Sequence, residues 1–222
     1  MKIVSGSNYT IYIPDRPTRA VIYLNAHIAF PSSNGRLSRT KYNFREEVAE
    51  AIYNDETVAI VGLYSKKLLE VTLDVIVGYH IPRVIVSGWS AGGNDALTIA
   101  SYINGLVLDL KVLLIDSNHT NNLSNDIFKK LKGVPISNVS NNLNKVKIKK
   151  LQKVIDNGLF NEYLLLVIPK SFKGSNHRYC RDSTMENHLY DYISRGFLDL
   201  TQYSVWKWDP EKKEMVLKWP ST

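Results

Sequence analysis

The chain has 222 residues, of which 44% are hydrophobic and 22% charged, which suits a single globular domain with a sizeable core. Its formal net charge of +7 admits an anionic partner, but no nucleic-acid-binding motif accompanies the lysines. No apolar run approaches the roughly 18 residues that a membrane span needs. The polar N-terminus does not resemble a signal peptide, and the single cysteine, Cys180, excludes an internal disulfide. We therefore expect a cytoplasmic protein.

The first half of the chain predicts strands and helices in alternation. Two short β-rich segments, 2–4 and 9–13, flank a turn-forming Ser-Gly-Ser-Asn stretch and predict an N-terminal hairpin. The continuous apolar run at 20–24 is typical of a central strand. The pattern then predicts a helix, a strand, a helix and a further strand, at 42–54, 57–61, 66–77 and from residue 84.

The second half continues this alternation. We expect strands at 111–116 and 163–168, helices at 122–132, 143–157 and 183–195, and a loop at 169–180. On the helix at 143–157, Ile148, Leu151, Val154 and Ile155 form an apolar stripe, so its many lysines are expected to lie on the solvated face. The alternation predicts an α/β fold, with a mostly parallel central sheet and helices on both faces.

The C-terminal segment departs from this pattern and predicts a β-hairpin, formed by residues 203–208 and 215–219. We expect residues 1–200 to form the main domain and residues 201–222 to be a hairpin extension packed on it. Trp206 and Trp208 share one face of the predicted strand. They either pack on the domain, join two copies in a homo-oligomer, or offer a stacking surface to a ligand such as a sugar.

The most informative stretch is residues 84–93, where an apolar strand leads into Gly88-Trp89-Ser90-Ala91-Gly92-Gly93 and then a predicted helix. A bare G-x-S-x-G is common in loops, so the motif gains its weight from the strand and helix around it. Serine at the tip of such a turn is forced toward positive φ, which requires small neighbours. This stretch resembles the nucleophile elbow of the α/β-hydrolase superfamily. The resemblance implies that fold, and it implies that Ser90 is a nucleophile.

The resemblance also implies a catalytic base and an acid. In that family the base follows the last core strand, which is the place of His177. The usual position of the acid falls within residues 139–145, which hold Asn141 and Asn142 but no carboxylate. Asp116, at the end of the strand after the elbow, offers an acid at the same sheet edge and in the order Ser, Asp, His. An Asp at a strand end can instead cap a turn, and then Asn141 or Asn142 would orient His177.

Backbone N–H groups that stabilise an oxyanion are a further implication of the resemblance. Ala91, at the start of the helix, is expected to supply one of them. In the family, the loop after the first central strand often holds a His-Gly pair, but here His27 is followed by Ile28. We expect the N–H of Ile28 or Ala29 to be the second donor, and Trp89 and His27 to lie against the substrate.

Together these residues predict a cofactor-free serine hydrolase, since the sequence holds neither a metal-binding motif nor a P-loop. No long insertion would form a lid, which favours a small-molecule substrate such as a short-acyl or carbohydrate-linked ester. The preference for an ester over an amide comes from the resemblance. Two alternatives remain open: a peptidase or thioesterase with the same catalytic residues, and a binding or structural protein that kept the fold without efficient catalysis.

Overall fold

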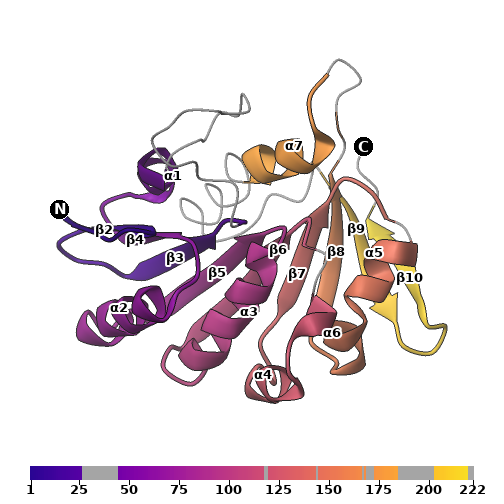
Figure 1. Cartoon of the computed structure of the whole chain (residues 1–222). Helices are drawn as coiled ribbons and strands as arrows, with labels where there is room; N and C mark the ends of the chain where they lie inside the picture. The colour runs from indigo at the N-terminus through magenta and orange to yellow at the C-terminus, as the bar shows by residue number, and fades with distance from the viewer. Residues whose placement is uncertain are drawn as a thin grey trace.

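A computed structural model of the chain describes residues 1–26, 45–117, 120–143, 145–166, 168, 173–184 and 203–219. These residues form one ten-stranded sheet with helices on both faces (Figure 1). The strand order across the sheet is β1-β2-β4-β3-β5-β6-β7-β8-β9-β10. The predicted α/β fold, with a mostly parallel central sheet, is therefore confirmed.

Six central strands, from β4 to β8 in that order, pair in parallel, and the two strands at either edge pair antiparallel. Both faces of the central strands are buried, which explains their continuous apolar runs. The strands are β1 (Lys2–Ser5), β2 (Tyr9–Ile13), β3 (Arg19–Leu24), β4 (Thr57–Gly62), β5 (Arg83–Trp89), β6 (Asp109–Ile115), β7 (Ile136–Ser140), β8 (Phe160–Leu166), β9 (Tyr203–Asp209) and β10 (Glu214–Trp219).

Two helices cover one face of the sheet and the other helices cover the opposite face (Figure 1). The first face carries α1 (Arg45–Ile52) and α7 (Asn176–Ser183). The opposite face carries α2 (Lys66–Gly78), α3 (Gly92–Ile103), α4 (Asn125–Lys130), α5 (Lys145–Lys150) and α6 (Gln152–Asp156). Alternate residues of each strand point to the two faces. On β3, for example, Ile22 joins the core under α2 and α3, whereas Tyr23 joins the core under α1 and α7.

Three sequence predictions need correction. Residues 139 and 140 belong to β7, a strand that the sequence did not predict. The polar Ser137 and Asn138 give this strand the composition of a loop, although Asn138 is buried. The single helix predicted at 143–157 is two short helices, α5 and α6, that meet at Leu151. The segment 176–180, predicted as loop, begins α7, in which the buried Cys180 and Arg181 anchor a helix whose sequence is otherwise polar.

The predicted C-terminal hairpin is present, with β9 and β10 paired antiparallel. Its strand β9 also pairs with β8, so the hairpin continues the main sheet. Trp206 and Trp208 are half-buried and pack against the core on the side of α6, whereas a role of these residues in an oligomer or in ligand stacking stays a prediction. The start of the predicted helix at 42–54 and all but the first residues of that at 183–195 lie outside the described residues. In the part of the chain that the structure describes, no helix has the length and apolarity to cross a membrane.

Candidate active site

The candidate nucleophile lies in a sharp turn between β5 and α3. Ser90 has a φ of 55°, in the left-handed region that an L-residue with a side chain rarely adopts. Two hydrogen bonds hold this conformation: the Ser90 N–H donates to the Ile115 carbonyl oxygen at 2.9 Å, and the Gly93 N–H donates to the Ser90 carbonyl oxygen at 3.2 Å. The turn thereby places Ser90 beside the end of the neighbouring strand β6.

The glycines of the motif are required by close contacts. A Cβ atom on Gly88 would lie 2.2 Å from the Gly92 carbonyl oxygen, and one on Gly92 would lie 2.3 Å from the Leu24 carbonyl oxygen. A Cβ atom on Gly93 would lie 2.0 Å from the Ser117 Oγ. Two of these three contacts are with rigid backbone. The turn can therefore form only if these positions lack side chains.

The helix that follows the turn supplies a region of positive potential. Ala91 is the N-cap of α3, whose twelve residues begin at Gly92. Backbone N–H groups at such a terminus lie at the positive end of the helix dipole and favour an anion. The other predicted oxyanion and substrate residues, His27 and Ile28, lie outside the described residues, so their roles stay predictions.

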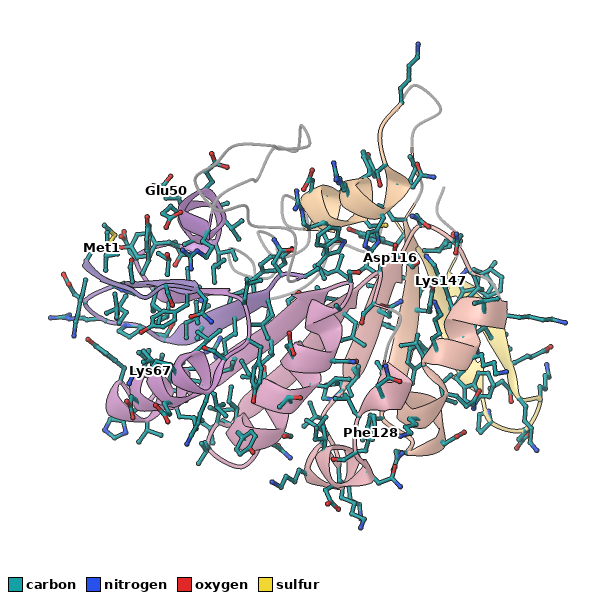
Figure 2. All side chains as sticks on the ribbon, viewed as in Figure 1. Met1, Glu50, Lys67, Asp116, Phe128 and Lys147 are labelled. Carbon is teal, nitrogen blue, oxygen red and sulfur yellow. The ribbon has the colours of Figure 1, made fainter. Side chains whose placement is uncertain are left out.

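Asp116 and His177, which the sequence placed at one sheet edge, contact one another. The Asp116 Oδ2 atom lies 2.5 Å from the His177 Nδ1 atom. Asp116 directly follows β6, has a φ of 45° and is only 3% exposed. Figure 2 shows it at the upper edge of the sheet, below α7. When Nδ1 carries the proton and donates it to this carboxylate, the Nε2 atom of His177 is left as the basic nitrogen.

Trp89 also contacts His177. Its Nε1–H donates a hydrogen bond to the His177 carbonyl oxygen at 3.1 Å, and the two rings stack with centroids 4.6 Å apart. The buried guanidinium of Arg181 lies 5.0 Å from the Trp89 ring centroid and pairs with Asp182. Trp89 is 6% exposed, and the predicted substrate contact of its side chain stays a prediction.

The surroundings of Asp116 keep its carboxylate charged. Burial by itself raises the pKa of this carboxyl group, but hydrogen bonds from His177, Lys147 and Ser140, together with the charge of Lys147, lower it to about 2. A carboxylate in this state can stabilise a positive charge on the imidazole ring of His177.

Lys147 and Ser140 were not singled out in the sequence. The Ser140 Oγ–H donates to the Asp116 Oδ1 atom at 2.6 Å, and the Lys147 ammonium group hydrogen-bonds to the same oxygen. The expectation that the lysines of α5 lie on a solvated face is thus wrong for Lys147. No sequence signal marked it, because it stands among similar lysines.

Two asparagines were considered as substitutes for the acid. The Asn141 Oδ1 atom accepts a hydrogen bond from Lys147 at 3.2 Å, and the backbone carbonyl oxygen of Asn142 accepts one from the Tyr163 hydroxyl at 2.7 Å. Asp116 itself contacts the Nδ1 atom of His177. The described residues contain no cluster of three or more His, Cys, Asp or Glu side chains that would suit a metal ion.

Solved structures resemble this chain, although no protein-family model and no curated protein sequence matches it. A dienelactone hydrolase from Anabaena variabilis is 14% identical, with a TM-score of 0.51 over 86% of this chain and 92% of that one. The thioesterase domain from the curacin biosynthetic pathway and Est1E from Butyrivibrio proteoclasticus are each 10% identical. Their TM-scores are 0.48 and 0.47, over 87% of this chain and 97% and 99% of theirs. The match to the dienelactone hydrolase shows that this chain has the α/β-hydrolase fold.

Proposed function

We propose that the protein is a serine hydrolase that cleaves an acyl ester through a covalent intermediate on Ser90. The observation that carries this proposal is the contact between Asp116 and His177 at the sheet edge where Ser90 occupies its strained turn. A serine hydroxyl is a weak nucleophile until a neighbouring base removes its proton. A buried carboxylate that orients an imidazole at the same sheet edge as a half-buried serine turn is an arrangement suited to this chemistry.

In the proposed reaction, the Nε2 atom of His177 takes the proton of the Ser90 hydroxyl as its oxygen attacks the acyl carbonyl carbon. The carbonyl oxygen becomes an oxyanion, which the Ala91 N–H at the start of α3 stabilises. Asp116 stabilises the imidazolium that forms. His177 then gives its proton to the leaving alkoxide, and the acyl group stays on Ser90.

The second half of the cycle releases the acid. A water molecule gives a proton to the Nε2 atom of His177 as it attacks the acyl-enzyme carbonyl. The second tetrahedral intermediate collapses, and His177 returns the proton to the Ser90 oxygen. The net reaction consumes one water molecule and yields an acid and an alcohol, without a cofactor.

Turnover of short-chain p-nitrophenyl esters tests this proposal. We expect a burst of p-nitrophenol equal to the enzyme concentration wherever deacylation is slower than acylation. The variants Ser90→Ala and His177→Asn should each lose on the order of 10³-fold or more in kcat/KM. The variant His80→Asn is the matched control, because His80 is exposed and precedes β5 at the opposite end of that strand from Ser90.

Equal activity in Ser90→Ala and wild type would contradict the proposal. A folded wild type that turns over neither oxygen esters nor their thioester analogues would favour a binding protein instead. Faster turnover of the thioester analogue through the same residues would make the protein a thioesterase.

A further inference from the structure

Lys147 differs from its neighbours on the lysine-rich helix α5. Its side chain is only 13% exposed, and it reaches the candidate active site from the face of the sheet opposite to α7. Figure 2 shows Lys147 beside Asp116 at the upper edge of the sheet. His177 and Lys147 therefore approach the same carboxylate from helices on opposite faces of the sheet.

The hydrogen bonds of Lys147 account for all three of its N–H donors. The Nζ atom contacts the Asp116 Oδ1 atom, the Ser140 Oγ atom at 2.7 Å and the Asn141 Oδ1 atom at 3.2 Å. An ammonium group has three donors, and three oxygens surround it here. Ser140 also donates to the Asp116 Oδ1 atom, so that oxygen accepts two hydrogen bonds while Oδ2 faces His177.

We propose that Lys147 is a positioning residue of the site: it fixes the Asp116 carboxylate so that Oδ2 faces His177, and its charge favours the uncharged form of the imidazole. This inference rests on the proposed function for its catalytic meaning, but the electrostatic effect on the Asp116–His177 pair can be measured without it. A cation near the pair partly offsets the carboxylate and disfavours a second positive charge on the ring.

The other titratable or charged groups around the pair do not supply this effect. Burial raises the pKa of the Tyr163 hydroxyl and of the Cys180 thiol, so both groups are neutral between pH 5 and about 9. Arg181 is paired with Asp182, which offsets its charge, and its guanidinium lies 5.0 Å from the Trp89 ring centroid. Within the part of the chain that the structure describes, Lys147 is the lysine or arginine whose charged group contacts Asp116.

Two measurements on Lys147→Met test the inference. Nuclear magnetic resonance follows the ring protons of His177 through a pH titration, with His177→Asn used for assignment. The second-order rate constant of labelling by a fluorophosphonate, measured against pH, reports the same ionisation through the reactivity of Ser90. We expect the titration midpoint and the acidic limb of the labelling profile to move upward by about one pH unit.

Two variants separate charge from simple packing. Lys147→Arg keeps the charge and should return the midpoint to within about 0.3 pH units of the wild-type value, although the planar group cannot reproduce all three hydrogen bonds. Lys145→Met is the matched control, because Lys145 is an exposed lysine of the same helix, and it should leave both curves unchanged. If Lys147→Met does not fold, Lys147→Gln takes its place with the same expected shift.

An unchanged His177 midpoint in a folded Lys147→Met or Lys147→Gln variant would overturn the inference. A midpoint that moves equally in Lys147→Arg and Lys147→Met would also overturn it, because the effect would then come from packing rather than charge. If the wild type is never labelled but the midpoint moves as expected, the role of Lys147 stands and the proposed hydrolase function fails.

Discussion

Replacing Asp116 by asparagine changes the stability of the protein in a way that depends on pH. Asparagine has nearly the shape of aspartate but no charge, so the variant keeps the packing and loses the ionic contacts with Lys147 and His177. We expect a lower free energy of unfolding than in the wild type at pH 7. The part of this difference that comes from the Asp116 carboxylate should shrink as the pH falls from about 5 toward 3.

The size of the effect follows from the pKa of Asp116. Burial raises this pKa, but the hydrogen bonds of His177, Lys147 and Ser140 and the charge of Lys147 lower it from the ordinary value of 3.8 to about 2. A shift of roughly two pKa units corresponds to about 2 kcal/mol of stabilisation. Because the folded pKa lies below the unfolded one, this stabilisation is fully present above pH 3.8 and is lost as the pH falls through about 2.

The assay is urea unfolding of wild type and Asp116→Asn at a series of pH values between 7 and 3. The variant also leaves the Lys147 charge without its carboxylate, but that cost is the same throughout this range and does not affect the pH-dependent part. Asp126→Asn is the control: Asp126 is 81% exposed and its ion pair with Lys129 is weak, so we expect less than about 0.5 kcal/mol. A wild-type advantage that does not shrink at low pH would refute the reasoning.

Three further predictions concern the turn, its support and the buried thiol. Gly92→Ala brings a Cβ atom within 2.3 Å of the carbonyl oxygen at the end of β3. The variant should lower the free energy of unfolding in urea by about 2 kcal/mol or more and should abolish fluorophosphonate labelling. Gly78→Ala is the control and should be neutral, because nothing lies within 4 Å of its added Cβ atom. Trp89→Phe removes the hydrogen bond to the His177 carbonyl oxygen but keeps an aromatic ring, and we expect labelling to slow by about 3- to 10-fold with little loss of thermal stability. Burial raises the pKa of the Cys180 thiol, so a thiol reagent at pH 8 should modify it only after unfolding; rapid reaction in the folded protein would contradict this burial.

The parts of the fold that the sequence predicted well are those with a strong local signal. The buried strands β3, β5 and β6 are continuous apolar runs, and α2 has its apolar residues at helical spacing. β7 was mostly missed because its sequence, Ile-Ser-Asn-Val-Ser, has the composition of a loop. Its Asn138 and Ser140 are buried because β7 lies between β6 and β8 in the sheet, and only the tertiary structure reveals that.

The candidate site was predictable where chain order fixes sheet position. Ser90 and Asp116 follow adjacent parallel strands, so their approach to the same edge follows from the topology alone. His177 was predicted at that edge as well, but in a loop, because the polar run before Cys180 has no helical periodicity that a short window can detect.

Lys147 shows what the sequence could not reveal. Its direction depends on where α5 begins relative to the end of β7, and on the break between α5 and α6 at Leu151. Leu151, at this break, is buried in the core, and the local sequence does not reveal the break. A lysine that faces a buried carboxylate therefore has the same local sequence as one that faces water.

The central claim, that Ser90 is an activated nucleophile, is tested most directly by the mass of the protein after reaction with a fluorophosphonate. Intact-mass measurement and peptide mapping should find one added group per chain, on the peptide that contains Ser90. The folded Ser90→Ala variant should gain no mass under the same conditions. A folded wild type that stays unmodified, or a label that persists at another residue in Ser90→Ala, would contradict the account.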